Sequence, residues 1–133
     1  MPGLFVTGTD TGVGKTLVSA GLVLALQRRG LEVMVMKPVA AGCRRSAAGL
    51  RNEDAEQLQA LLNRQVEYSS VNPCPLEAAA APHLVAAEEG RIIEVDSLVA
   101  AIRSQAEQHF TVVEGAGGWR VPLDERADMS TLA

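Results

Sequence analysis

The chain is poor in aromatic residues, cysteine and histidine, and each shortage argues against a class of function. Aromatic residues make up only 3% of the chain, too few for the stacking surfaces that bind single-stranded nucleic acid. The two cysteines, Cys43 and Cys74, show no paired spacing and are predicted to be reduced thiols. His83 and His109 lack partners at a catalytic or zinc-binding spacing, so neither a nucleophilic triad nor a zinc site is predicted.

Long apolar runs and an excess of basic charge are also missing. No apolar stretch approaches the roughly 20 residues that a membrane-spanning helix needs, and no basic-then-apolar signal segment opens the chain. The net charge of −4 argues against a nucleic-acid partner. With 133 residues, 47% of them apolar, the sequence predicts one cytoplasmic α/β domain over residues 1–133.

The strongest motif is the glycine-rich segment Gly8–Thr16, which reads Gly-Thr-Asp-Thr-Gly-Val-Gly-Lys-Thr. It follows a short apolar run and opens into an apolar helical pattern, which is the context of a phosphate-binding loop. Glycines let successive amides point at phosphate oxygens, and the helix dipole favours the same anion. Lys15 is then expected to reach the terminal phosphates, and the Thr16 hydroxyl to ligate Mg²⁺. The alternative is a strand-to-helix turn carrying one exposed lysine; Thr9 also stands where the common spacing has glycine.

Residues 3–8, 14–29 and 32–36 are predicted to form a strand, a helix ended by Gly30 and a second strand. This βαβ order predicts a parallel sheet with a right-handed crossover. Apolar residues cover much of the helix. They make a broad apolar surface of Leu17, Val18, Gly21, Leu22, Leu24, Ala25 and Leu26.

The remaining elements alternate between helix and connection. Residues 40–51 are predicted as a loop, 66–82 as a connection with short helical pieces, and 110–114 as the third strand. Helices are predicted over 53–64 with Asn52 as the cap, over 83–89 ended by Gly90, and over 96–108 capped by Asp96 or Ser97.

A helix start at Asp128 is followed by only about one turn of sequence. Three parallel strands would also leave an open sheet edge. The expected fold is therefore a parallel-sheet P-loop NTPase-like α/β fold, as the N-terminal part of a longer, C-terminally truncated domain.

Two charged residues end predicted strands, where open parallel sheets bind their ligands. Glu114 is expected to hold Mg²⁺ opposite Thr16, and the alternative is a carboxylate bonded to its own glycine turn. Lys37 is placed either near the phosphates or in solvent. Asp54 lies in the first turn of a helix, where dipole capping explains it without any further role.

Together these motifs resemble the dethiobiotin synthetase family. The resemblance rests on Phe5–Thr16 and Lys37-Pro38-Val39, and continues through Gly49–Asn52 with Asp54, Val71-Asn72-Pro73, Pro82-His83-Leu84 and Val113–Gly118. The longer phosphate loop is the family's own version.

The resemblance implies an ATP- and Mg²⁺-dependent cyclo-ligase that closes the ureido ring of dethiobiotin from 7,8-diaminononanoate and CO₂. One amine captures CO₂ as a carbamate, which the γ-phosphoryl group converts into a carbamic–phosphoric anhydride. The second amine attacks the carbonyl and phosphate leaves. A homodimer is implied for the full-length protein.

The resemblance also implies roles for single residues. Lys37 contacts the carbamate and the migrating phosphoryl group, Lys15 the phosphates, and Thr11 lies within reach of the substrate. Thr16, Asp54 and Glu114 are implied as the magnesium ligands. ATP is bound by Gly12, Val13, Gly14, Lys15, Thr16, Leu17, Asp54, Glu114, Gly115, Ala116 and Gly117. Ala41 replaces a hydroxyl residue, and Gly12 a glutamate, of some relatives.

Two other functions stay open at this stage. A nucleotide-switch ATPase of the ParA/MinD type shares the deviant loop, but its signature lysine would align with the acidic Asp10. The other alternative is an inactive fragment that binds nucleotide.

Overall fold

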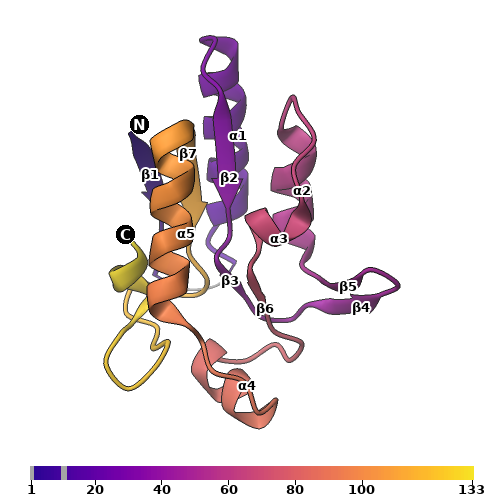
Figure 1. The fold of residues 1–133 in the computed structure, drawn as a ribbon, viewed down its shortest axis with the longest axis vertical. Helices are drawn as coiled ribbons and strands as arrows, with labels where there is room; N and C mark the ends of the chain where they lie inside the picture. The colour runs from indigo at the N-terminus through magenta and orange to yellow at the C-terminus, as the bar shows by residue number, and fades with distance from the viewer. Residues whose placement is uncertain (1, 10–11) are drawn as a thin grey trace.

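The computed structural model describes residues 2–9 and 12–133. Three strands, β1 (Gly3–Val6), β7 (Phe110–Glu114) and β2 (Val33–Met36), form the main sheet in the order β1-β7-β2 (Figure 1). Both pairings are parallel. The predicted parallel α/β sheet is therefore confirmed. The last strand in sequence lies between the first two, so the sheet brings the end of β7 between the ends of β1 and β2.

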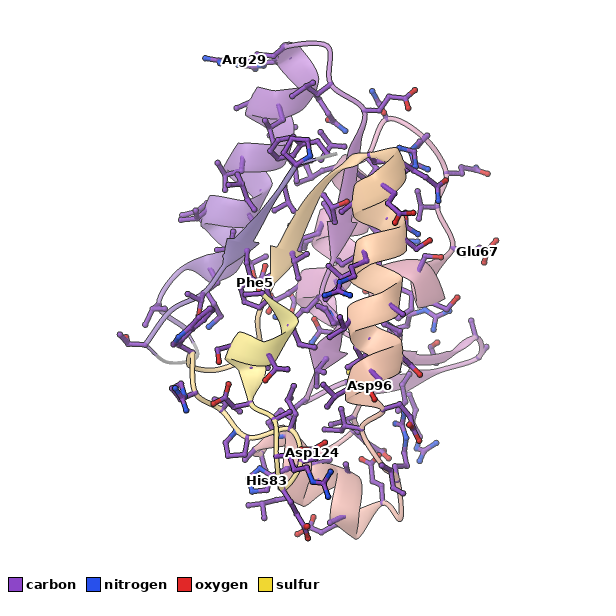
Figure 2. The ribbon with its side chains drawn as sticks, turned by 60° about the vertical axis from the view of Figure 1, so that its left-hand side comes forward. Phe5, Arg29, Glu67, His83, Asp96 and Asp124 are labelled. Carbon is purple, nitrogen blue, oxygen red and sulfur yellow. The ribbon has the colours of Figure 1, made fainter. Side chains whose placement is uncertain are left out.

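Helices cover both faces of this sheet. Figure 2 shows α1 (Lys15–Arg28) on one side and α5 (Val95–Gln108) on the other. Buried aliphatic side chains such as Val23, Val35 and Val112 fill the space between sheet and helices. Helix α1 ends where predicted, since Gly30 has a φ of 83°, a left-handed conformation that glycine adopts easily.

Much of the broad apolar surface predicted for α1 faces outward. Leu17 is 80% exposed, and Val18 and Leu24 are about half exposed, whereas Lys15, Ser19 and Val23 are buried. The helix is apolar on most of its circumference, so hydrophobic spacing cannot select its buried side. We call the outward residues Leu17, Val18, Gly21 and Leu24 the exposed stripe of α1.

Residues 40–51, predicted as a loop, contain strands. β4 (Arg44–Ser46) and β5 (Gly49–Arg51) form an antiparallel hairpin, and β3 (Val39–Ala40) pairs in parallel with β6 (Cys74–Pro75). Two ion pairs tie the hairpin to neighbouring segments: Arg44 to Glu56 at 2.7 Å and Arg45 to Glu77 at 2.8 Å. These partners are distant in sequence, which explains why local composition suggested a loop.

The helix predicted after Asn52 is confirmed as α2 (Glu53–Leu61). The Asn52 side chain accepts the N–H of Ala55 at 3.0 Å, so the predicted cap is also confirmed. The helix ends three residues before the predicted 64, at Leu61. A four-residue helix, α3 (Tyr68–Val71), lies in the predicted connection 66–82.

The next two predicted helices are α4 (Pro82–Glu88), followed by Gly90 with a φ of 66°, and α5. The predicted caps of α5 are wrong. The helix begins at Val95 after Glu94, without a side-chain cap, and Asp96 therefore lies within its first turn.

The segment after β7 ends in a 3₁₀ helix, η1 (Met129–Leu132), whose start at Asp128 is confirmed by a capping box. A second core of Val39, Leu76, Val85, Leu123 and Met129 lies at the carboxyl end of the strands. In the described part of the chain, no helix combines the length and apolar character needed to cross a membrane.

Candidate functional site

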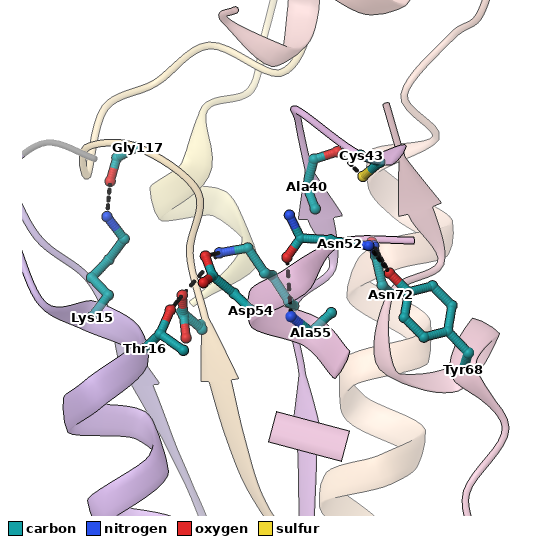
Figure 3. A network of polar contacts seen from close by, with 12 residues as sticks. Lys15, Thr16, Ala40, Cys43, Asn52, Asp54, Ala55, Tyr68, Asn72 and Gly117 are labelled. Atoms are coloured by element: carbon teal, nitrogen blue, oxygen red, sulfur yellow. Dashed lines mark hydrogen bonds and ion pairs between the residues drawn. The ribbon is translucent and has the colours of Figure 1, made fainter. Parts of the chain in front are cut away.

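The three carboxyl ends of the main sheet meet at one carboxylate. Oε1 of Glu114, the last residue of β7, accepts a hydrogen bond from the Thr16 hydroxyl at 2.8 Å. The same oxygen lies 2.8 Å from Nζ of Lys37, the residue that follows β2. Thr16 follows the phosphate loop that leaves β1, so the strand order itself explains the meeting. Figure 3 shows the polar network around this site, with Thr16 and Asp54 labelled.

Asp54 is a second carboxylate near Lys37. Its Oδ2 lies 3.6 Å from the Lys37 ammonium, and its side chain is 44% exposed, against 6% for Lys37. The first turn of α2 presents Asp54, and the Asn52 cap determines where that turn begins. Lys37 is thus a buried cation between one buried and one accessible carboxylate.

One oxygen of the buried carboxylate remains open. Glu114 is 1% exposed, and its Oε2 has no hydrogen-bond partner among the described residues. Burying a charged oxygen without a partner is costly, and a bound ion, water or ligand at this atom would offset that cost. This Oε2 belongs to the same carboxylate whose Oε1 contacts Thr16 and Lys37.

The oxygen atoms around this position fit Mg²⁺. Mg²⁺ prefers oxygen ligands and is usually bound through one or two carboxylates, water and substrate phosphates. Thr16, Glu114 and Asp54 supply a hydroxyl and two carboxylates. In residues 2–9 and 12–133, no group of three or more His, Cys, Asp or Glu side chains forms a fuller cage. The donors therefore suit an ion that shares its coordination with phosphate.

The described part of the phosphate loop has the backbone that the motif predicts. Gly12 and Gly14 have φ angles of 79° and 99°, in the left-handed region. α1 begins after Gly14 without a side-chain hydrogen bond that caps it, and a helix start of this kind favours anion binding. Lys15 is 8% exposed, and its Nζ donates to the carbonyl of Gly117 at 3.0 Å.

These groups line a cleft of about 660 Å³, a size typical of small-molecule sites. One wall carries the phosphate loop, Lys37, Asp54 and Glu114. Other lining residues are small and apolar and include Ala41, the segment 79–82 and Val121; we call them the apolar wall. The cleft can accept both an anionic group and an aliphatic chain.

Most of the predicted site residues lie in this cleft: Gly12, Gly14, Lys15, Thr16, Leu17, Lys37, Asp54, Glu114, Ala116 and Gly117. Val13 and Gly115 are not among its lining residues; Val13 is 54% exposed, and Gly115 packs against Phe5 and Met129. Thr11 lies outside the described residues. The chemical role of each residue stays a prediction.

The sequence did not reveal the apolar wall or the place of Asn52. Ala79–Ala81 carry no polar side chain and lie within the predicted connection 66–82. Asn52 was predicted as a helix cap, but it also lines the cleft. Capping already accounts for the Asn52 side chain, so the sequence gives no sign that this residue also lies at the cleft.

Comparison with known proteins agrees with the site. A family model described as an AAA domain matches residues 2–133. The chain is 53% identical over 130 residues to the ATP-dependent dethiobiotin synthetase BioD of Cellvibrio japonicus, covering 97% of this chain and 57% of that protein. The BioD proteins of Chromohalobacter salexigens and Pseudomonas aeruginosa (strain UCBPP-PA14) are 48% and 47% identical, over 97% and 100% of this chain.

The chain spans 55% and 59% of those two relatives, and thus little more than half the length of the curated relatives it matches. The match nevertheless extends over 97% to 100% of this chain. The resemblance to dethiobiotin synthetases is therefore confirmed, and the chain belongs to the AAA-domain family whose model matches residues 2–133.

Proposed function

We propose that the protein is an ATP-dependent ligase that makes dethiobiotin from 7,8-diaminononanoate and CO₂. The observation that carries the proposal is the shared Oε1 of Glu114, held by Thr16 and Lys37 beside the glycine-rich loop. This arrangement supports a role for Lys37 as a fixed cation, and for Glu114 as a metal ligand, beside a terminal phosphate. The names of the relatives support the activity.

We propose that Thr16, Glu114 and Asp54 hold Mg²⁺ together with the phosphates of ATP. The open Oε2 of Glu114 supports this assignment. When bound, the ion would neutralise charge on the transferred phosphoryl group. Lys15 and the first amides of α1 would bind the other phosphate oxygens.

In the proposed reaction, one substrate amine first adds to CO₂ and loses a proton, giving a carbamate. The carbamate oxygen then attacks the γ-phosphorus of ATP, and ADP leaves. The second amine attacks the carbonyl of the resulting anhydride and closes the ring with loss of phosphate and a proton. Lys37 would hold the carbamate and the phosphoryl group together, because two anions approach each other only beside a fixed cation.

The apolar wall supports the substrate class. Ala41, Ala79 and Val121 present no charged group, so they suit the methylene chain of a diamine better than its amino groups. We further propose that the full-length protein works as a cytoplasmic homodimer, in line with its free thiols Cys43 and Cys74.

The proposal is tested by ATP-dependent incorporation of ¹⁴C-bicarbonate into diaminononanoate by the full-length protein. We expect a labelled cyclic urea, and a loss of at least about 100-fold in kcat for Lys37→Ala, which removes the fixed cation. Arg29→Ala, at the far end of α1, is the matched cation control and should keep the wild-type rate. Absence of labelled product, with ATP hydrolysis that needs no diamine, would instead support a nucleotide-switch ATPase.

A further inference from the structure

The single tyrosine of the chain lies next to the site without touching the cleft. Tyr68, the first residue of α3, is 8% exposed and does not line the cleft. Its hydroxyl oxygen accepts the backbone N–H of Asn52 at 2.7 Å and Nδ2 of Asn72 at 2.8 Å (Figure 3). Both hydrogen bonds are buried, so each is strengthened by the low local dielectric constant.

The bond to Asn52 holds the start of α2. Asn52 is the cap of that helix: its side chain accepts the N–H of Ala55, and its carbonyl accepts the N–H of Glu56. Asp54 lies in the chain between Asn52 and these two anchored amides. Removing the Tyr68 hydroxyl would leave the buried N–H of Asn52 without this partner and release the turn that presents Asp54.

The same short helix also holds the other side of the ion pair. The carbonyl of Val71, the last residue of α3, accepts the backbone N–H of Lys37 at 2.8 Å. α3 is therefore bonded to both segments whose side chains meet at 3.6 Å, Lys37 on one and Asp54 on the other. This connection links the two backbone segments that carry the Lys37–Asp54 ion pair.

The ring of Tyr68 is fixed independently of its hydroxyl. The guanidinium carbon of Arg51 lies 4.2 Å from the ring centroid, a cation–π contact. The ring also belongs to the main hydrophobic core. A phenylalanine would keep both contacts, so Tyr68→Phe removes the two hydrogen bonds and little else.

We propose that Tyr68 is a positioning residue, which holds Asp54 beside Lys37 through Asn52 and thereby sets the Mg²⁺ requirement of the site. The inference rests on the proposed function for its metal, and on the contacts above for its geometry. Two of the three proposed magnesium ligands are carboxylates, and of these Glu114 is buried and Asp54 is accessible. Asp54 is therefore the carboxylate whose position can change without opening the core.

The first test measures binding of a non-hydrolysable ATP analogue to the full-length protein by calorimetry at increasing Mg²⁺. In Tyr68→Phe, the Mg²⁺ concentration for half-maximal binding should rise about fivefold, the effect of one lost buried hydrogen bond. The double variant Tyr68→Phe/Asp54→Asn should need no more Mg²⁺ than Asp54→Asn alone, because Tyr68 acts through Asp54. An unchanged requirement, or additive effects, would overturn the proposal.

Thr111→Val is the matched control, because it also removes a hydroxyl whose hydrogen bond, to His109, lies away from the site. Its Mg²⁺ requirement should equal that of the wild type. A purely structural effect of losing a hydroxyl would instead shift both variants alike, and that result would also overturn the proposal.

The second test needs no nucleotide and measures amide hydrogen exchange at residues 53–56. Exchange should be faster in Tyr68→Phe than in the wild type and unchanged in Thr111→Val; equal rates in all three proteins would refute the positioning role. A wild-type protein whose ATP binding ignores Mg²⁺ would refute the proposed metal site, and with it the metal part of this inference. The exchange rates would still decide the geometry.

Discussion

Nζ of Lys37 and Oε1 of Glu114 lie 2.8 Å apart, in side chains that are 6% and 1% exposed. A buried charge that loses its partner destabilises a protein by about 3 kcal/mol. We therefore expect Glu114→Gln and Lys37→Met each to lower the free energy of unfolding by about that amount. Urea denaturation measures the change.

The double variant Lys37→Met/Glu114→Gln should be more stable than either single variant, because neither charge is left alone. Loss equal to the sum of the single effects would contradict the ion-pair explanation. Arg45→Met and Glu77→Gln, which break an exposed pair, should each change stability by less than about 1 kcal/mol.

Lys15→Met is expected to weaken ATP binding roughly 10- to 100-fold, the value of a hydrogen bond between charged groups. The fold should persist, because the lysine is replaced by a side chain of similar length. Arg29→Met is the control, since this residue lies at the opposite end of the same helix (Figure 2). Calorimetry with an ATP analogue checks both, and equal affinities for the two variants would contradict a phosphate role.

Gly118 lies against the phosphate loop, and a β-carbon there would be 3.0 Å from the carbonyl oxygen of Thr9. Gly118→Ala should therefore move one loop away from the other and weaken ATP binding several-fold. Gly21→Ala has open space around it on α1 and should raise stability by up to about 1 kcal/mol without changing affinity. Equal ATP affinity in Gly118→Ala and the wild type would show that the contact is unimportant.

Burial raises the pKa of both cysteine thiols above the ordinary value of 9.0. The folded protein therefore keeps these protons at a pH where the unfolded chain releases them. Below pH 9.0, titration of Cys43 and Cys74 should leave the free energy of unfolding unchanged. That free energy should fall as the pH rises from 9.0 through the folded pKa values of the two thiols. The pH dependence of urea unfolding measures this.

The double variant Cys43→Ala/Cys74→Ala is the control for that measurement, and its stability should fall less steeply above pH 9.0 than that of the wild type. Parallel curves would show that the thiols do not contribute. In the native wild type, both thiols should also react slowly with a disulfide reagent at neutral pH and rapidly after unfolding.

The sequence was most informative where local chemistry alone determines structure. The glycine-rich loop, the Asn52 cap and the Gly30 stop each depend on backbone conformation or on a neighbouring side chain. The strand-end positions of Lys37 and Glu114 also followed from apolar runs that end in a charge. Their 2.8 Å contact needed the strand order, which places β7 between β1 and β2.

The features that were missed depend on distant partners. The β4–β5 hairpin is stabilised by ion pairs to Glu56 and Glu77, and its three-residue strands are too short to show alternation. The buried side of α1 depends on which sheet face it meets, since its sequence is apolar nearly all round. Tyr68 carried no signal, because a lone tyrosine before a short helix has no partner at fixed spacing.

The unpaired edge of β1 and the exposed stripe of α1 are two surfaces that favour association with other chains. Among residues 2–9 and 12–133, β1 is paired with β7 on one side only, and α1, which contacts β1, carries the exposed stripe. An open strand edge recruits further strands, and an apolar patch beside it adds affinity without selectivity. A preparation of these 133 residues alone will therefore polymerise or precipitate as it is concentrated, unless another surface shields the edge and the stripe.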